Sequence, residues 1–261
     1  MDPDVNSDWL RARLVRPGSG WTQVSTVATT GSTNADLAAA AREGAESGQV
    51  LVSDHQSTGR GRFTRVWEAP PGTSLAISAL LRPPSDVPAS RWLWLPLLAG
   101  LAVADGIRAA TGVRADVKWP NDVLIDGRKV CGILAERVDG DSDAAAAIIG
   151  MGVNTTLTAE QLPVPTATSL ALAGVEVNPG EVAAAILEAL GEWYLRWLGG
   201  SDLRVDYAAR CSSVGRTVRV LLSEHESVVG EATGVDVNGC LLVQVDGTQR
   251  AFAAGDVSHL R

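Results

Sequence analysis

Cysteine and histidine are scarce in this sequence, with three of each among 261 residues. Cys131, Cys211 and Cys240 are odd in number, widely spaced and form no CxxC pair. Neither they nor the three histidines give a zinc-binding pattern, because such sites need ligands at short, regular spacings. Separated cysteines favour reduced thiols, which indicates a cytoplasmic protein.

Long apolar runs and targeting segments are also missing. The longest apolar run, residues 92–104, contains Pro96 and is shorter than the roughly 18 residues that a membrane span needs. We interpret it as a buried helix. The first residues, MDPDVNSDWLRARL, are acidic and lack an apolar core, so we expect no signal peptide and no membrane partner.

Positive charge is in deficit, with 22 Lys and Arg against 30 Asp and Glu and a net charge of −8. That balance disfavours non-specific binding of nucleic acid. Residues 54–67, DHQSTGRGRFTRVW, nevertheless place Arg60, Arg62 and Arg65 among glycines. Glycine lets backbone approach a ligand, and arginine brings a permanent cation with a planar fork of donors. The stretch predicts a loop that receives an anion, with a solvated surface turn as the alternative.

Residues before about 212 interleave strand and helix signals, which predicts a mixed α and β domain. Ser32 and Thr33 precede an alanine-rich helix, and Thr33 has capping-box spacing to Asp36. Asp126-Gly127 is a favoured hairpin pair. Strands are expected at 21–27, 49–54, 74–81 and within 115–138, a strand running into a glycine-containing turn at 144–154, and helices at 90–111 and from Asn178-Pro179 to Gly199.

The sequence pattern changes after about residue 212. Short segments with partial alternation are separated by Asn238-Gly239 and Asp246-Gly247, which are hairpin pairs. We predict a small all-β module, an SH3-like β-barrel. The expected division is therefore a catalytic domain at 1–211 and a β domain at 212–261.

Four motifs of the large domain have a familiar order and spacing. They are GSTN (31–34), GRGRFTRVW (59–67), KWPND (118–122) followed by GRKVCGIL (127–134), and GMGVN (150–154). Together they resemble the biotin protein ligases, the biotin–[acetyl-CoA-carboxylase] ligase family. The resemblance covers almost the whole chain. It implies an α+β, class II synthetase-like fold: a mixed sheet with flanking helices, followed by the SH3-like domain.

The resemblance also implies an activity. Such ligases join biotin to ATP, giving biotinyl-5′-AMP and pyrophosphate, with Mg²⁺ on the ATP phosphates. They then transfer biotin to a lysine of a biotin carboxyl carrier domain of acetyl-CoA or acyl-CoA carboxylase. Fixed cations suit both steps, because charge is spread over phosphate oxygens. We expect a monomer or a weak homodimer and no DNA partner.

Site residues are implied in the same way. The biotin ureido ring is assigned to Ser32, Thr33 and Gln56, and the pocket wall to Gly132 and Leu134. The carboxylate end and the phosphates are assigned to Gly59, Arg60, Arg62 and Lys129, of which Lys129 and Arg62 are the expected catalytic residues. The nucleotide is assigned to Arg62, Arg65, Trp67, Lys129 and Asn154.

The chain departs from the family pattern at Phe63 and Thr64, where relatives usually carry a basic residue and a glycine. Thr64 would resist a left-handed conformation at a cost of about 1 kcal/mol. Some relatives carry a winged-helix domain in front, but only about twenty residues precede the strand at 21–27, so DNA binding is not carried over.

Other interpretations remain open from the residues alone. A lipoate–protein ligase would share the fold, a nucleic-acid-binding regulator could use the Gly-Arg loop, and an interaction scaffold could use the β module. At the level of residues, Ser32 and Thr33 fit a plain helix cap and Lys129 fits a hairpin turn. Trp67 fits the core and Asn154 an ordinary turn.

Overall fold

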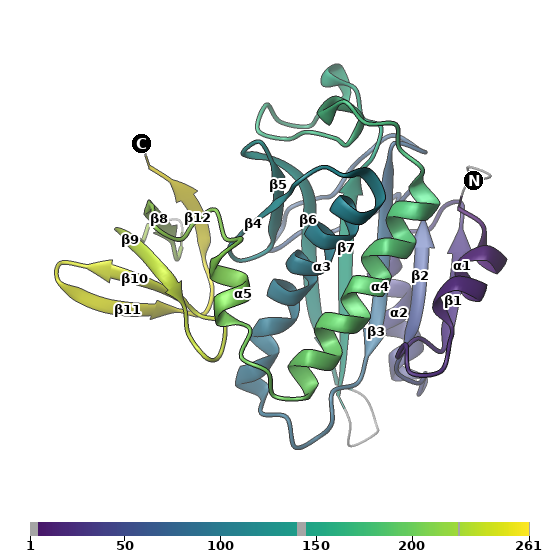
Figure 1. The fold of residues 1–261 in the computed structure, drawn as a ribbon, viewed down its shortest axis with the longest axis horizontal. Helices are drawn as coiled ribbons and strands as arrows, with labels where there is room; N and C mark the ends of the chain where they lie inside the picture. The colour runs from purple at the N-terminus through teal and green to yellow at the C-terminus, as the bar shows by residue number, and fades with distance from the viewer. Residues whose placement is uncertain (1–4, 140–144, 224, 261) are drawn as a thin grey trace.

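The structure is a computed structural model that describes residues 5–139, 145–223 and 225–260. Within these residues the chain forms a seven-stranded and a five-stranded sheet (Figure 1). The larger sheet has the order β1-β2-β3-β7-β6-β5-β4, in which only β1 and β2 pair in parallel. Its strands are β1 (Gln23–Val27), β2 (Gln49–Ser53), β3 (Ser74–Leu81), β4 (Asp116–Lys118), β5 (Asp122–Ile125), β6 (Arg128–Val138) and β7 (Ala146–Asn154).

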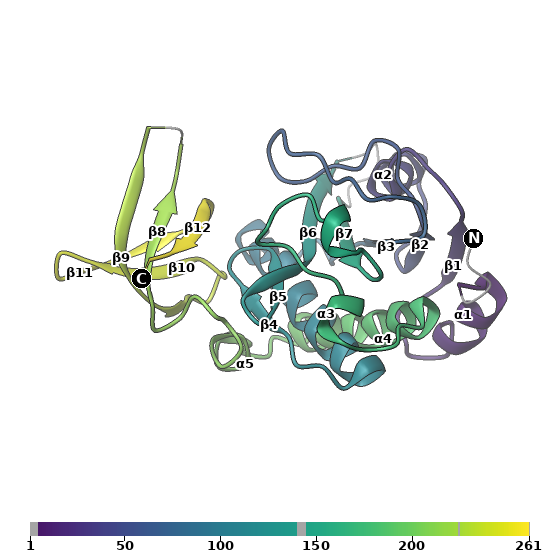
Figure 2. The same ribbon diagram turned by 90° about the horizontal axis from the view of Figure 1, so that it is seen from above.

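Helices cover both faces of this sheet, which agrees with the predicted mixed sheet with flanking helices. The helices α3 (Trp94–Thr111) and α4 (Pro179–Leu198) pack side by side on one face, and α2 (Thr33–Arg42) lies on the other (Figure 2). At the sheet edge, α1 (Ser7–Leu14), which was not predicted, packs against β1 and α4. Shorter helices are α5 (Arg204–Ala208), η1 (Ala89–Leu93), η2 (Ala159–Gln161) and η3 (Ala171–Ala173).

The N-terminal end of α2 differs in detail from the prediction. Ser32 is the cap residue, and its side chain accepts a hydrogen bond from Ala35 N at 3.4 Å. The predicted capping box of Thr33 and Asp36 does not form, because the Asp36 carboxylate instead accepts from the hydroxyl of Thr30. The N-cap residue is therefore Ser32, one position before the predicted Thr33, and Thr33 is the first residue of the helix.

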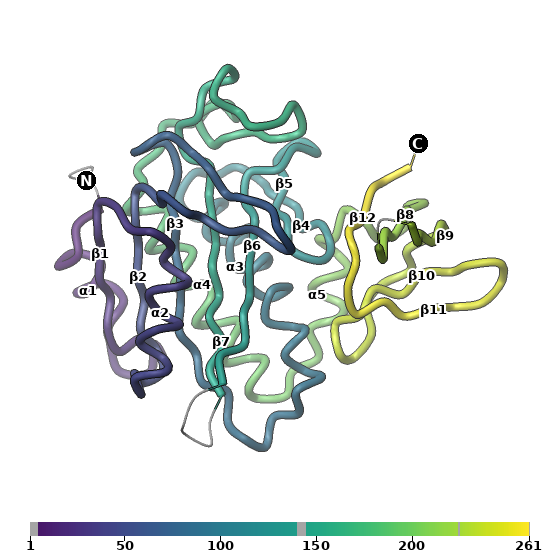
Figure 3. The backbone as a smooth tube through the Cα atoms, turned by 180° about the vertical axis from the view of Figure 1, so that it is seen from behind, coloured from purple at the N-terminus to yellow at the C-terminus, as the bar shows by residue number. Residues whose placement is uncertain are grey.

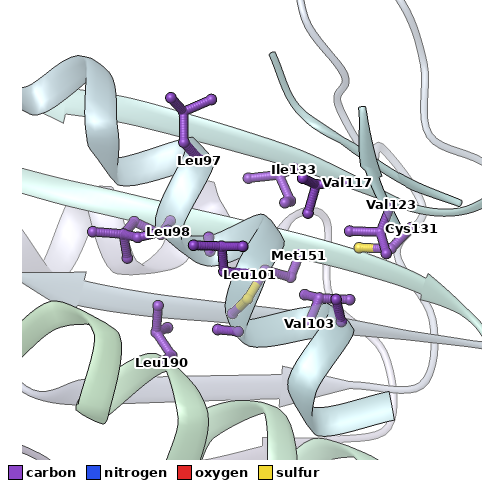
Figure 4. Packing of buried hydrophobic residues seen from close by; sticks show 14 of the residues in the cluster. Leu97, Leu98, Leu101, Val103, Val117, Val123, Cys131, Ile133, Met151 and Leu190 are labelled. Carbon is purple, nitrogen blue, oxygen red and sulfur yellow. The ribbon is translucent and has the colours of Figure 1, made fainter. Parts of the chain in front are cut away.

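The core lies between the large sheet and the α3–α4 layer. Every residue of β3 is buried, and Leu98 and Leu101 of α3 face Met151 of β7 and Leu190 of α4 (Figure 4). By length and composition alone, Ala89–Thr111 would qualify as a membrane span, yet 67% of its apolar window is buried inside the molecule. It is a core helix, as its sequence predicted.

Strand β7 corrects another prediction. Residues 150–154, GMGVN, were expected to leave the strand in a glycine-containing turn. They remain in β7 and pair with β3 and β6, with Gly152 opposite both Ala76 and Gly132. Residue 144 of the predicted strand lies outside the described residues. The glycines of β7 are therefore strand residues, and their purpose is close approach rather than a bend.

The five-stranded sheet follows α5 and confirms the predicted β module. Its antiparallel order is β11-β10-β9-β8-β12. The predicted hairpin at Asp246-Gly247 forms with both residues left-handed, at φ 47° and 77°. Its strands are β8 (Thr217–Leu221), β9 (Ser227–Val235), β10 (Leu241–Val245), β11 (Thr248–Phe252) and β12 (Asp256–His259).

Two tryptophans fasten the small sheet to the large domain. Trp94 Nε1 donates to the carbonyl of Val237 at 2.9 Å, and Trp119 Nε1 donates to that of Gly239 at 3.1 Å. Both indoles are buried, and their apolar cluster continues into the small sheet. Because each buried N–H has its acceptor across the junction, the two sheets hold a defined relative position.

Helices α3 and α4 cross closely at Gly106, and this contact yields a stability prediction. A Cβ on Gly106 would lie 2.5 Å from Cα of Ile186, whereas one on Gly100 would meet side chains only, those of Val117 at 3.2 Å and Ile133 at 3.6 Å. We expect Gly106→Ala to lower the free energy of unfolding by about 1–3 kcal/mol, because backbone cannot yield as a side chain can. Gly100→Ala is the control in the same helix. Urea unfolding measures the stability of both variants, provided that the dependence of the unfolding free energy on urea concentration is unchanged. Equal stabilities of the two variants would contradict the close crossing.

Candidate active site

A cavity of about 110 Å³ lies between the N-terminal end of α2, the loop after β2, and strands β6 and β7. The loop after β2, which we call the arginine loop (residues 54–67), crosses in front of β6 toward the small sheet (Figure 3). It closes on itself through Gly61 N donating to Arg65 O at 2.8 Å and Trp67 N donating to Gly59 O at 2.9 Å. The cavity is thus walled by a helix end, a structured loop and a rigid sheet.

Three glycines form the floor of this cavity. A Cβ on Gly152 would lie 2.5 Å from Cε2 of Trp67, and one on Gly132 would lie 2.9 Å from Cζ3 of the same ring. A Cβ on Gly150 would overlap the carboxamide of Asn34. Only glycine lets the indole and the carboxamide lie directly on the sheet.

One end of the cavity carries uncharged polar groups. Gln56 Oε1 accepts from Thr33 N at 2.9 Å and from Thr33 Oγ1 at 3.0 Å, and Ser78 Oγ lies 2.7 Å from Thr33 Oγ1. This network fixes the Gln56 carboxamide with its NH₂ group turned away from Thr33. Since the Ser32 oxygen already accepts from the helix, its hydroxyl proton is left to donate. The wall therefore offers a ligand several oriented donors and acceptors.

The cavity lining also carries four cations, Arg60, Arg62, Arg65 and Lys129, which the sequence had assigned to the site. Each lies beside a carboxylate. Arg60 is 3.2 Å from Glu136, whose carboxylate also accepts from Asn34 Nδ2 at 2.8 Å. Lys129 Nζ is 2.6 Å from Asp122 Oδ1. The carboxylates offset the repulsion that four gathered cations would otherwise feel.

Arg62 and Arg65 share one carboxylate from the small sheet. Both Arg65 Nη atoms contact Asp256, and Arg62 Nη1 is 3.5 Å from Asp256 Oδ1 and 3.2 Å from the carbonyl of Gly255. Burial lowers the pKa of Arg62, and the negative charge of Asp256 opposes that shift. A cation so placed interacts strongly with an anion, because little water screens it.

Lys129 is held by backbone hydrogen bonds, and its side chain is partly buried. It lies near the start of β6, where its N–H donates to Thr166 O at 2.8 Å and its carbonyl accepts from Thr168 N at 2.8 Å. Its Nζ lies 5.8 Å from the centroid of a Trp67 ring. A plain hairpin lysine would extend further into water, so this geometry favours a site lysine, and a catalytic role for Lys129 stays a prediction.

Sequence comparisons identify the family. The sequence model of the Biotin/lipoate A/B protein ligase family matches residues 27–154, and that of the Biotin protein ligase C terminal domain matches residues 214–260. The biotin–[acetyl-CoA-carboxylase] ligase of Mycobacterium tuberculosis is 40% identical over 266 residues, covering 100% of this chain and 98% of that protein. The chain belongs to the biotin protein ligases.

Further biotin protein ligases support this assignment. The bifunctional ligase/repressor BirA of Bacillus spizizenii is 33% identical over 221 residues, which is 82% of this chain and 67% of that protein. The structure of the biotin protein ligase of Aquifex aeolicus in complex with biotin and ATP has a TM-score of 0.77 and 25% identity. It covers 92% of this chain and 100% of that one. The predicted ligase fold with its C-terminal β domain is confirmed.

The cavity gathers most of the residues that the family resemblance assigned to the site. Gly59 and Asn154 are not part of its lining. Gly59 lies behind Trp67, whose carbonyl leaves no room for a Cβ. Asn154 is 4% exposed, and its Nδ2 donates to the carbonyl of Thr168 at 2.9 Å. That bond engages the amide in the protein, so contact with a nucleotide stays a prediction for Asn154.

Of the two residues that depart from the family pattern, Phe63 and not Thr64 takes the left-handed backbone conformation. Phe63 is left-handed at φ 57°, whereas Thr64 is not among the positive-φ residues. The Phe63 ring is 71% exposed and lies 5.0 Å from the guanidinium carbon of Arg62. The expected strain at Thr64 is therefore wrong, and the phenyl ring instead covers one face of a site cation.

Sequence reasoning missed Asp122, Glu136 and Asp256, which pair with the site cations, and Asn34, which is hydrogen-bonded to Ser78 and Glu136. Asn34 and Asp122 belong to the quoted GSTN and KWPND motifs, so a signal was available for both. Asp256 has none, because it lies 191 residues from Arg65 in sequence.

Proposed function

We propose that this protein joins the carboxylate of biotin to the α-phosphate of ATP, releasing pyrophosphate. It then passes the biotinyl group to a lysine of a biotin carboxyl carrier domain of an acyl-CoA carboxylase. The observation that carries this is one cavity lined both by oriented uncharged groups and by Lys129, Arg60 and Arg62. Biotin has the matching polarity, with a ureido ring at one end and a carboxylate at the other. The cations offset the repulsion between this carboxylate and the phosphates.

Lys129 and Arg62 would have separate tasks. Lys129 Nζ, on a fixed strand, would neutralise charge between the carboxylate and the α-phosphate as the new bond forms. Arg62 and Arg65, on the arginine loop, would hold the phosphates and keep water from the adenylate. Trp67 Nε1 supports a ligand here, because it is buried without a hydrogen-bond partner among the described residues. An acceptor on a bound ligand would satisfy that donor.

Magnesium would enter with ATP rather than bind to a protein cage. Among the described residues there is no group of three or more His, Cys, Asp or Glu side chains that could hold a metal ion. Mg²⁺ is commonly bound through substrate phosphates with few protein ligands, which suits this site. When present it would supply charge neutralisation on the phosphates, while the arginines position them.

Biotin rather than lipoate is the proposed acid. The hydroxyl of Ser32 and the Thr33–Gln56 pair present both donors and acceptors, as a ureido ring requires. The dithiolane of lipoate offers no N–H or carbonyl to this end and would leave those groups unpaired, which lowers affinity. The family comparisons also favour the biotin ligases.

We place the activation chemistry in residues 1–211 and a supporting role in residues 212–261. The small sheet would help to close the site and meet the acceptor domain, consistent with its contacts to Arg62 and Arg65. Cys131, Cys211 and Cys240 are free thiols, which suits the cytoplasm. We propose a monomer or a weak homodimer that needs no DNA.

The deciding experiment is detection of the adenylate. The protein is incubated with ATP, Mg²⁺ and either biotin or lipoate, and the products are identified by mass spectrometry. We expect biotinyl-5′-AMP and pyrophosphate with biotin only, followed by transfer to a purified carrier domain but not to a variant with arginine at the acceptor lysine. Adenylate from lipoate alone would overturn the choice of acid, and no adenylate from either would overturn the activity.

Arg62→Ala should weaken retention of the adenylate more than its formation. The guanidinium reaches the site from the arginine loop, so its loss opens a route to water while Lys129 on β6 still serves the chemistry. We expect free biotinyl-AMP to accumulate in the medium roughly tenfold faster, the equivalent of about 1.4 kcal/mol. Filtration of single-turnover mixtures measures it. Arg114→Ala, at an exposed arginine paired with Asp116, is the control. Unchanged leakage with intact biotin binding would contradict the clamp.

A further inference from the structure

Among the residues that the structure describes, Asp256 is the one acidic residue of the small sheet that forms ion pairs with site cations, Arg62 and Arg65. It begins β12, whose backbone pairs with β8, with Asp256 opposite Leu221. Its carboxylate is therefore carried by a rigid strand, whereas Arg62 and Arg65 are carried by a loop. Because the strand is more rigid than the loop, the position of Asp256 determines where the arginine side chains lie.

The contacts of Arg62 leave one side of its guanidinium for a ligand. Within the described part of the chain, its hydrogen bonds all use Nη1, which reaches Asn121 Oδ1 at 3.3 Å, Gly255 O at 3.2 Å and Asp256 Oδ1 at 3.5 Å. Nη2 and Nε remain as donors. Because the guanidinium is planar and rigid, fixing Nη1 also fixes the direction of the other N–H groups.

Arg65 has a different part in the same cluster. Both of its Nη atoms contact the two carboxylate oxygens of Asp256, a paired geometry that adds directional restraint. Its side chain is 61% exposed, against 19% for Arg62 and 25% for Asp256. Both arginines line the cavity, with Arg62 the more buried of the two, and Arg65 ties the outer part of the arginine loop to the small sheet.

We propose that Asp256 is a positioning residue, supplied by the small sheet, that orients Arg62 toward the phosphates of ATP and holds the arginine loop through Arg65. The small sheet is then part of the active site without touching substrate. The nucleotide half of this proposal rests on the proposed function, but the ordering of the loop does not.

The first test needs no ligand. Hydrogen exchange of residues 58–66 is compared in wild type, Asp256→Asn, Asp256→Glu and Asp246→Asn. Asp246 is a matched control, because it is an exposed aspartate of the same sheet at a left-handed turn position that asparagine also tolerates. We expect exchange to be roughly 5- to 30-fold faster in Asp256→Asn, as for loss of a charged hydrogen bond. Asp256→Glu should restore much of the protection, and Asp246→Asn should match wild type.

The second test measures the orientation of Arg62. Asp256→Asn should raise the KM for ATP by roughly 5- to 30-fold while the affinity for biotin changes little. If Asp256 acts through Arg62, the same substitution should have little further effect on the KM in an Arg62→Ala background. A merely structural role would lower the unfolding midpoint and change the affinities for both substrates together.

Each outcome decides one half of the proposal. Unchanged exchange of residues 58–66 in Asp256→Asn would overturn the hold on the loop. Faster exchange with an unchanged KM for ATP, or an equal effect in the Arg62→Ala background, would overturn the orientation of Arg62. If wild type forms no adenylate, the proposed function fails, and the exchange comparison still tests Asp256 by itself.

Discussion

Replacing Lys129 by alanine should slow the formation of biotinyl-AMP by roughly 10²–10³, the equivalent of about 3–4 kcal/mol by analogy with the loss of one oxyanion donor. Its Nζ lies in the cavity beside Asp122 and Trp67, at the end of a side chain whose backbone is fixed on both sides. The other site cations, Arg60, Arg62 and Arg65, lie on the arginine loop and not on β6. The loss should fall on kcat/KM, and the unfolding midpoint should change little. Single-turnover formation of the adenylate measures it.

Arg128→Ala is the matched control for Lys129. Arg128 is the preceding residue of the same strand, and its side chain is exposed. Its removal takes away one positive charge without touching the cavity, so adenylate formation should stay within about twofold of wild type, far below one tenfold step of 1.36 kcal/mol. If Lys129→Ala were also within about threefold of wild type, the lysine would be a structural residue and not the catalytic one.

Gly152→Ala should have the next largest effect, and it acts through Trp67. The new Cβ would lie 2.5–2.9 Å from Cε2, Cζ2 and Nε1 of the indole, so the ring must leave the sheet. Overpacking of this kind costs about 1–3 kcal/mol. We expect that cost to appear as a roughly 5- to 100-fold rise in the KM for ATP and faster loss of the adenylate, since Trp67 ends the arginine loop. Steady-state kinetics and filtration measure both.

A compensating variant separates this clash from damage to the strand. Trp67→Phe removes the indole atoms that the new Cβ would meet, so Gly152→Ala should cost much less in that background than in wild type. Equal losses in both backgrounds would mean that Gly152 matters for β7 itself and not for the close approach of Trp67.

Local sequence patterns predicted the structure correctly where neighbouring residues decide the backbone conformation. The hairpin pair Asp126-Gly127 takes left-handed angles of 49° and 75°, as two-residue turns require. The apolar run of β3 is buried along its whole length, and Asn178 caps α4. By contrast, the sequence of α1 has little apolar periodicity. This helix is held by packing and by ion pairs between Arg13 and residues of α4, which are more than 160 positions away in sequence.

The site shows the same division. The sequence by itself indicated cations that the cavity does bring together, and it placed them on or beside glycine-containing backbone, because charge and backbone freedom belong to single residues. It also placed Lys129 beside a hairpin. The role of Gly150 and Gly152 as strand floor was decided only by tertiary structure. A glycine in the sequence indicates conformational freedom and room for a close contact. Only the tertiary structure shows which side chain lies against it.

Tertiary structure alone decided which carboxylates hold the cations. The sheet order β3-β7-β6 brings together strands that are far apart in the chain, and the junction of the two sheets brings Asp256 to Arg62 across 194 residues. No local pattern encodes such a pair, because ion pairing depends on distance in space and the chain path between the partners is long. The sequence therefore determined the chemistry that the site can perform, and the packing of two sheets determined how its cations are aimed.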